Sequence, residues 1–294
     1  MLQWGLTMAE GRTLEQGRAL PWAFFRLSPF PQIALRVMKM VSKEEASMFK
    51  LAEVISSDPA FAMELLTIAN SPLFAPRYPA TNILDAISRL GTKNIQGICL
   101  TVAVRTYLGK SLNFPAMKMI WNHNLATALV SEQLALAFSL NKDDAYTAGI
   151  MHDIGRLAMA SIKPREYAEL LEKFAGPAEA ILGAEESLFG FDHCEAGRQL
   201  TESWNLPDEF AAIVGGHHHD FPVSPGALDW PMQALVHLAC SMTDAVGFAA
   251  FKHCQVPKCD ALYGLLPERA ANHFPTEEQL KNLVSEKIRS VQHP

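Results

Sequence analysis

The chain has 294 residues, of which 49% are hydrophobic and 19% are charged, and its net charge is −6. This balance excludes a disordered chain and supplies enough apolar side chains for one large domain or two ordinary ones. Because its basic residues are scattered and a phosphate-backbone binder needs a basic stripe, a nucleic acid is not expected as the main ligand.

The chain shows no sign of membrane insertion or export. No apolar run approaches the ~20 residues that cross a bilayer, and the segment from Met1 to Arg12 lacks the regions of a signal peptide. The five cysteines form no CxxC pair, which favours reduced thiols in a cytoplasmic protein. Cys254 and Cys259 with His253 offer at most half of a zinc site, and surface or loop residues are the plainer interpretation.

Helical periodicity dominates the chain, and no segment alternates convincingly with the period of two typical of a half-buried strand. After an N-terminal extension (1–20), residues 21–115 predict a lobe of helices. Its clearest start signal is Asp58-Pro59, an N-cap residue followed by proline at the first helical position. The helices expected in this lobe are 32–41, 44–55, 59–70, 82–90 and 92–108, with the last two separated at Gly91.

Residues 116–251 predict a second helical lobe, and residues 252–294 a C-terminal extension. A long amphipathic helix is expected at 116–140, followed by one that starts at Asp143 or Asp144 and continues through His152 to Leu157. Further helices are expected to open at Pro164, Pro177, Asp192 and Pro207, before an apolar segment (228–251) and a charged, solvent-exposed helix within 275–292. No flexible linker separates the lobes, so we expect them to pack closely.

A set of titratable residues in the second lobe lies on the inward faces or the ends of its predicted helices. These residues are His123, His152, Asp153, His193, His217, His218 and Asp244. A buried carboxylate is costly unless it is paired, hydrogen-bonded or bound to metal, and this donor set suits divalent iron, manganese, zinc or nickel. Hydrogen-bonded core residues are the alternative, and the residues alone leave the two interpretations evenly balanced. The pattern does not decide whether His217 or His218 faces the site.

Short motifs follow one another in a fixed order along both lobes. They are ISSDP (55–59), LL (65–66), ANS (69–71), AISRLG (86–91), WNH (121–123), AGIMHDIG (148–155), HCEAG (193–197), WNLP (204–207) and HH (217–218). In this order they resemble the HDOD domain, a branch of the HD superfamily of metal-dependent phosphohydrolases, over about residues 20 to 250. The resemblance implies an all-α fold, a multi-helix HD-like bundle with an N-terminal helical lobe packed on it.

The resemblance also implies a function. HDOD domains are generally regarded as signalling modules, and many have lost part of the metal site, whereas the equivalents of the HD ligands mostly remain here. One or two divalent ions are therefore expected, or none if the site is vestigial. Related cyclic di-GMP phosphodiesterases carry a lysine where this chain has Arg156, and their GYP signature is absent, which disfavours that activity.

Two functional hypotheses follow. The first is a regulatory module that binds a signalling protein or a small ligand in a groove between the lobes, where Asn70, Ser71 and Gly91 either line the surface or merely cap and end helices. The second is a phosphohydrolase acting on a nucleotide or phosphodiester, in which Asp153 bridges the ions or orients water and Arg156 steadies the phosphate. In it, one ion is held by His123, His152, Asp153 and Asp244, and a second by His193 and His217 or His218. No substrate loop is evident, so the regulatory module ranks first, and the oligomeric state is open.

Overall fold

The computed structural model describes residues 30–42, 47–74, 77–109, 112, 114–219, 226–227, 229–271 and 273–292. The first lobe comprises α1 (Gln32–Ser42), α2 (Met48–Ser56), α3 (Pro59–Ala69), α4 (Ile83–Leu90) and α5 (Thr92–Leu108). The second lobe comprises α6 (Pro115–Phe138), α7 (Lys142–Met151), α8 (Ile154–Ile162), α9 (Pro164–Lys173), the 3₁₀ turn η3 (Ala178–Ala180), α10 (Ile181–Phe189), α11 (His193–Ser203), α12 (Asp208–Gly216) and α13 (Met232–Ala245). The C-terminal helices are α14 (Cys259–Tyr263), α15 (Glu268–Ala271) and α16 (Glu277–Gln292).

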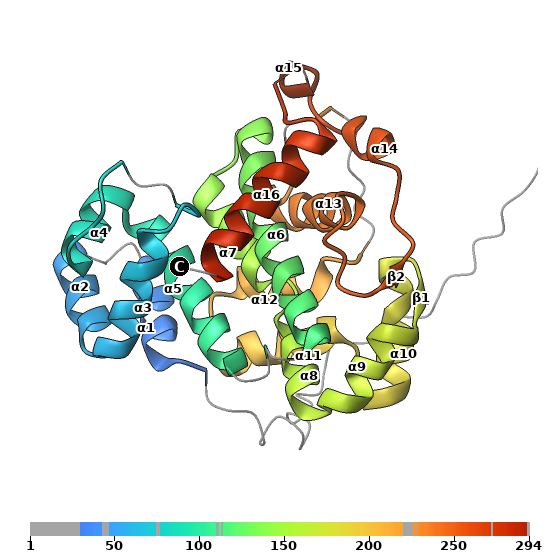
Figure 1. The fold of residues 1–294 in the computed structure, drawn as a ribbon, viewed down its shortest axis with the longest axis horizontal. Coiled ribbons are helices and arrows are strands. Elements are labelled where there is room, and N and C mark those ends of the chain that lie inside the picture. Colours follow the sequence, from blue (N-terminus) through green and yellow to red (C-terminus); the bar gives the residue numbers. More distant parts are fainter. Residues whose placement is uncertain are drawn as a thin grey trace, which may run out of the picture.

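The protein is all-α, as predicted, apart from one short parallel pair of strands (Figure 1). Strand β1 (Ala175–Gly176) pairs with β2 (His253–Cys254), which joins the C-terminal segment to the second lobe. Two residues are too few to produce an alternating pattern, so the sequence could not reveal these strands. Among the described residues, no helix combines the length and the apolar character needed to span a membrane.

Capping side chains define several helix starts. Asp58 Oδ1 accepts hydrogen bonds from the backbone N–H groups of Ala60 and Phe61 at 3.0 and 3.1 Å, which confirms the predicted start of α3. The predicted start of α7 at Asp143 or Asp144 is wrong, because Asn141 is the cap and accepts from both of their N–H groups. The aspartates lie instead in the first turn, where negative charge is favourable.

The helix expected to run from Asp143 to Leu157 is two helices. Helix α7 ends at Met151 and α8 begins at Ile154, with Asp153 between them at φ −103° and ψ 22°. The sequence contains neither proline nor glycine at this break, so the local signals favour a continuous helix. Tertiary packing overrides them, and the turn lets the two helices contact different neighbours.

The two lobes pack closely through α5, as expected. In Figure 1 the first lobe lies to one side of the second, and α5 lies between α1, α3 and α4 on one side and α7 on the other. Contact on both sides explains why α5 is buried nearly all round. Within the first lobe, the Asn70 amide donates to the Ala80 carbonyl at 2.9 Å and accepts from the Ala80 N–H at 2.7 Å. Gly91, at φ +87°, separates α4 from α5 as predicted.

Helix α16 is less exposed than its charge suggests. It packs against α6 and buries one apolar face, formed by Leu280, Val284, Ile288 and Val291. The expectation of a solvent-exposed helix therefore holds only for its opposite, charged face. An apolar residue at every third or fourth position was the signal of this packing.

Candidate metal centre

The second lobe brings the ends of several helices together at one buried place. His152 directly follows α7, Asp153 precedes α8, His193 begins α11 and His217 follows α12. His123 reaches the same place from within α6. All five side chains are at most 1% exposed.

Two glycines of the AGIMHDIG motif make this convergence possible. A Cβ at Gly149 would lie 2.6 Å from the Ala128 Cα, because α7 and α6 touch there through their backbones. A Cβ at Gly155 would lie 1.9 Å from the His193 carbonyl oxygen, because α8 and α11 touch in the same way. The motif thus holds the His152-Asp153 turn between two close helix contacts.

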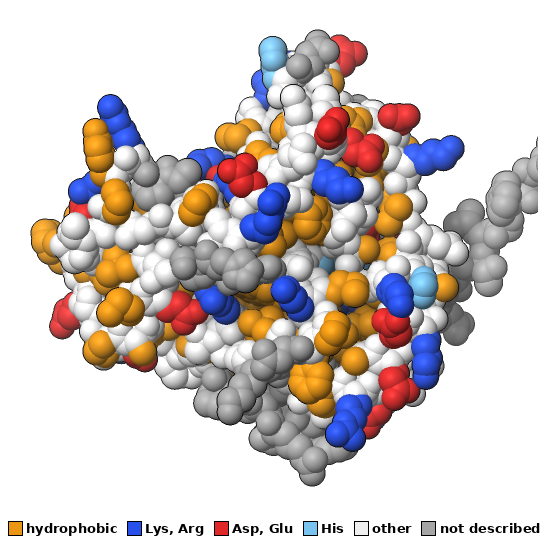
Figure 2. Space-filling view, in the orientation of Figure 1, with side chains coloured by type: hydrophobic (Ala, Val, Ile, Leu, Met, Phe, Trp, Pro, Cys, Tyr) orange, Lys and Arg blue, Asp and Glu red, His pale blue; other side chains and the backbone are white. Residues whose placement is uncertain are grey.

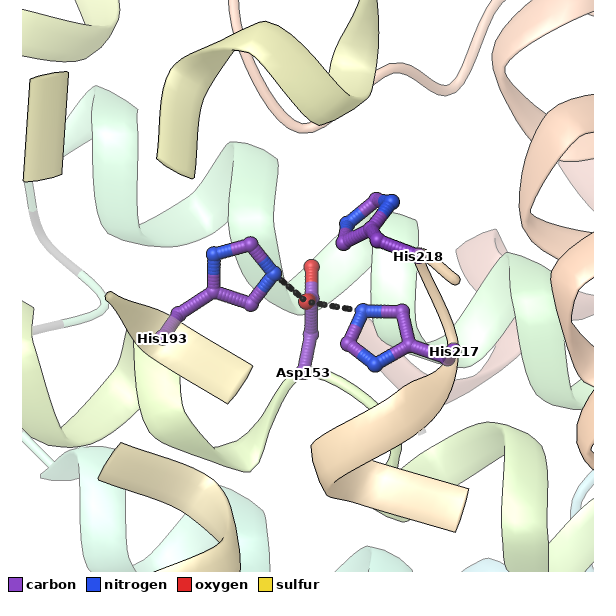
Figure 3. A group of neighbouring side chains, drawn as sticks. All are labelled: Asp153, His193, His217 and His218. Carbon is purple, nitrogen blue, oxygen red and sulfur yellow. Dashed lines mark ion pairs between the residues drawn. The ribbon is translucent and has the colours of Figure 1, made fainter. Parts of the chain in front are cut away.

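The first group of potential ligands is formed by Asp153, His193, His217 and His218, which we call the aspartate group (Figure 3). Asp153 Oδ1 lies 3.2 Å from His193 Nε2 and 3.3 Å from His217 Nε2. Within the described part of the chain, this oxygen and the Nε2 atoms of all three histidines have no hydrogen-bond partner. Four converging polar atoms without hydrogen bonds fit a cation bound between them. Both His217 and His218 belong to the group.

The second group is formed by His123, His152 and Cys240, which we call the thiol group. The Nε2 atoms of His123 and His152 lie 3.2 Å apart, and the Cys240 sulfur lies 3.5 Å from His123 Nε2. Asp153 Oδ2 lies further away, at 3.7 and 3.8 Å from the two nitrogens. Asp153 therefore stands between the two groups.

Backbone carbonyls and one carboxylate orient the imidazoles. The Nδ1 atoms of His123, His152 and His217 lie 2.7–2.9 Å from the carbonyl oxygens of Phe248, Gly149 and Val214, respectively, and that of His193 lies 2.6 Å from Glu185 Oε2. Each Nδ1–H can donate to its oxygen, so each Nε2 faces the centre and can offer its lone pair to a metal once it carries no proton. This is the usual arrangement of metal-binding histidines and their supporting hydrogen bonds.

Asp244 lies on the other side of His123 from the two groups. Its Oδ1 is 3.3 Å from His123 Nδ1, and its Oδ2 accepts a hydrogen bond from Cys254 at 3.7 Å. The sequence hypothesis made it a ligand of the same ion as His152; in the structure its Oδ1 faces Nδ1 of His123 rather than Nε2. His253, Cys254 and Cys259 belong to no potential ligand group among the described residues.

Arg156 is buried, and two nitrogens of its guanidinium have carboxylate partners. Its Nε lies 2.7 Å from Asp153 Oδ2, and its Nη1 donates to Glu185 Oε1 at 3.2 Å. Glu185 also accepts hydrogen bonds from the Tyr167 hydroxyl at 2.5 Å and from the His193 backbone N–H at 3.0 Å. With Arg156 only 1% exposed, its charge serves these carboxylates.

Comparison with known proteins places the chain in a family. The sequence model of the HDOD domain matches residues 27–220. The chain belongs to the HDOD family. An uncharacterized protein of Treponema pallidum (strain Nichols) is 24% identical over 205 residues, which are 68% of this chain and 39% of that relative. The HDOD chain thus spans less than half of its relative's length.

Two solved structures share the HDOD chain's fold. A candidate phosphohydrolase from Shewanella amazonensis SB2B matches with a TM-score of 0.62 at 19% identity, over 91% of this chain and 98% of the other. A candidate signal transduction protein from Marinobacter aquaeolei VT8 matches with a TM-score of 0.62 at 22% identity, over 91% of this chain and 60% of the other. At such identities the likeness shows the fold alone.

The electrostatics of the HDOD centre favour a cation. Although burial by itself acts in the opposite direction, the Arg156 guanidinium and the adjacent imidazoles hold the pKa of Asp153 well below its usual range. Burial also opposes charge on the histidines, but Glu185 and Asp153 raise the pKa of His193 to about 10, and Cys194 and Asp153 raise that of His217 to about 9. In the metal-free protein, protons on these two imidazoles therefore balance the buried carboxylates.

The donor atoms also have spacings that suit a metal. For bonds of about 2.1 Å in tetrahedral geometry, two nitrogen or oxygen donors lie about 3.4 Å apart. The aspartate group has 3.2 and 3.3 Å between its oxygen and two of its nitrogens. Imidazole and carboxylate ligands suit iron, manganese, zinc or nickel, and such an ion would polarise a bound water or phosphoryl group.

Sequence reasoning missed three residues of the centre, namely Tyr167, Glu185 and Cys240. Glu185 lies four residues after the buried Ile181 and four before Phe189, so helical spacing already places its carboxylate on the inward face of α10. Cys240 precedes Asp244 by one turn of α13, on the same face. The sequence therefore contained a signal for Glu185 and one for Cys240.

Proposed function

We propose that this HDOD chain is a signal-transduction module that holds a metal ion in its second lobe and binds a protein segment or small ligand between its lobes. The observation that supports this most directly is the pairing of Arg156. A phosphate-binding arginine points its N–H donors at the substrate, whereas Nε and Nη1 of this buried guanidinium pair with Asp153 and Glu185. We therefore assign Arg156 a supporting role rather than contact with a substrate.

A cavity of about 300 Å³ between the lobes offers the binding place. Lys93 and Gln96 of α5 line it from the first lobe, and Glu209 and Phe210 of α12 from the second. Lys93 Nζ also pairs with Asp144 Oδ2 of α7 across the interface, at 2.6 Å. Because α12 ends at the metal centre and lines the cavity, the metal and a bound partner can influence one another through this helix.

The distribution of charge on the visible surface agrees with a protein segment or a small ligand as the partner. On the face shown in Figure 2, Lys and Arg side chains are interspersed with Asp and Glu, without a continuous basic stripe. Such a face does not suit a nucleic acid. The proposal therefore names a protein segment or a small ligand.

Hydrogen exchange with and without bound zinc tests the signalling role. We expect zinc to slow exchange at the end of α12 and also at α5 on the far wall of the cavity, because both helices are coupled through the interface. The His152→Ala variant, which loses a potential ligand, should show a much smaller change. Protection confined to the ligand residues, with α5 unaffected, would contradict the proposal.

Phosphohydrolase activity is the second candidate, supported by two adjacent ligand groups with Asp153 standing between them. It predicts metal-dependent hydrolysis of a nucleotide or phosphodiester that disappears in the Asp153→Ala variant. Elemental analysis of untagged wild-type protein and of that variant should accompany the assay. Turnover that survives the substitution would eliminate this candidate.

A further inference from the structure

Cys240 lies where a ligand to His123 and His152 would lie. The three side chains come from α13, α6 and the end of α7, and none is more than 6% exposed. We propose that His123, His152 and Cys240 form a second metal position, with a thiolate ligand, that takes zinc or a similarly thiophilic divalent ion. This inference rests on the proposed metal centre and specifies its second position.

Two donor–donor distances within the thiol group agree with a tetrahedral zinc site. Zinc–nitrogen bonds of about 2.05 Å and zinc–sulfur bonds of about 2.3 Å place two nitrogens about 3.3 Å apart, and nitrogen and sulfur about 3.6 Å apart. The structure has 3.2 Å between the two Nε2 atoms and 3.5 Å between the sulfur and His123 Nε2.

The histidine tautomers also suit a cation. Nδ1 of His123 and Nδ1 of His152 each lie within hydrogen-bond distance of a backbone carbonyl, so each carries the proton. Their Nε2 atoms lie 3.2 Å apart, a contact that needs either a proton donated from one ring to the other or a cation beside both atoms. A bound cation satisfies this need.

The neighbouring carboxylates are less well placed than the thiol to serve as the anionic ligand. Asp153 Oδ2 is paired with Arg156 Nε at 2.7 Å and lies 3.7 Å or more from both imidazole nitrogens. Asp244 faces Nδ1 of His123, on the opposite side of the ring from the group. Cys240 is the remaining anionic candidate, and a metal-bound thiol loses its proton to become a thiolate.

Cobalt substitution tests this position. Metal-free full-length protein titrated with Co²⁺ should show visible d–d bands from bound cobalt and a near-ultraviolet thiolate-to-cobalt charge-transfer band. Cys240→Ser should lose the charge-transfer band while the aspartate group keeps its d–d bands, which also report a folded protein. The controls Cys194→Ser, beside His217 on its Nδ1 side, and Cys99→Ser, buried in α5, should keep the band.

Every outcome of the cobalt titration either supports or overturns the proposed thiolate position. Loss of the band in Cys240→Ser and in Cys240→Ala, but not in the controls, supports the thiolate position. Cobalt that binds to the wild type without a charge-transfer band overturns it and leaves the aspartate group intact. A band that persists in Cys240→Ser overturns it as well. Failure of the wild type to bind any cobalt overturns both this inference and the proposed metal centre.

Discussion

The two lobes use buried and half-buried polar side chains in opposite ways. In the first lobe they satisfy the backbone: Asn70 bridges both polar groups of Ala80, and the Ser71 hydroxyl donates to the Ile68 carbonyl at 2.7 Å. In the second lobe the side chains of the centre turn atoms without hydrogen bonds towards one another, among them Asp153 Oδ1 and the Nε2 atoms of His193 and His217. A buried polar atom without a hydrogen bond is costly, so it persists where a ligand satisfies it.

This comparison separates residues that support the fold from residues that could bind a metal. Substitutions in the first lobe should change stability alone, whereas those in the second should also change metal affinity. Four predictions test this division, from the largest expected effect to the smallest.

Gly155→Ala should prevent folding or destabilise the protein by more than about 3 kcal/mol. The added Cβ would meet the His193 carbonyl at 1.9 Å, and neither α8 nor α11 can withdraw without displacing Asp153 or His193. Denaturant unfolding measures the effect. Gly183→Ala in α10 is the matched control, because nothing lies within 4 Å of its Cβ, and a gain of about 0.5–1 kcal/mol is expected there. Equal stability of the two variants would contradict the close helix contact.

Glu185→Gln should cost about 3–5 kcal/mol, because it leaves the buried Arg156 with one carboxylate partner fewer. It should also weaken zinc binding by about 10- to 100-fold, since Glu185 orients His193. Unfolding and calorimetric titration measure the two effects. The adjacent, exposed Glu186 provides the control variant Glu186→Gln, which should match the wild type in both. Unchanged zinc affinity in Glu185→Gln would remove the orienting role.

Metal affinity should rise with pH. In the metal-free protein the pKa values of His193 and His217 are raised to about 10 and about 9, so a metal must displace their protons at neutral pH. Affinity should then increase by about tenfold per pH unit for each proton displaced, until pH reaches these values. By the same linkage, the metal-free protein should lose stability as pH rises from the ordinary histidine pKa of 6.5 towards the folded-state values of about 9 and about 10, because only the folded state keeps these protons in that range. Chelator competition at several pH values measures the affinity, and a flat profile would contradict the prediction.

Asn70→Ala should destabilise the first lobe by about 1–3 kcal/mol, because the N–H and carbonyl of Ala80 lose their side-chain partner. Zinc affinity should equal that of the wild type. Thermal unfolding and zinc titration on the same preparation distinguish the two lobes. A large loss of zinc binding would show that the first lobe contributes to the centre.

The sequence predicted most of the helices because their caps are local. Asp58, Pro59 and Gly91 act within a few residues of their own positions, so their signals do not depend on the rest of the fold. The break between α7 and α8 has no such residue, and it exists because Gly149 and Gly155 allow backbone contacts with helices distant in sequence. Local propensity could not reveal it.

The candidate ligands were found in the sequence as residue types on inward faces, but their partners were not. His217 and His218 both join one group, a choice that the consecutive histidines left open. Asp244 Oδ1 lies on the Nδ1 side of His123, and the Cys240 sulfur lies beside its Nε2. Such distinctions depend on which nitrogen of a ring faces which neighbour.

By itself the sequence determined the all-α class, the HDOD motifs, most helix boundaries and the polar residues that point inward, since each follows from spacing and composition along the chain. Only the tertiary structure decided the turn at His152-Asp153, the burial of Arg156 between two carboxylates and the division of the ligands into two groups. These features require atoms from helices far apart in sequence to lie within about 4 Å of one another, a distance over which electrostatic interactions in a buried site are strong.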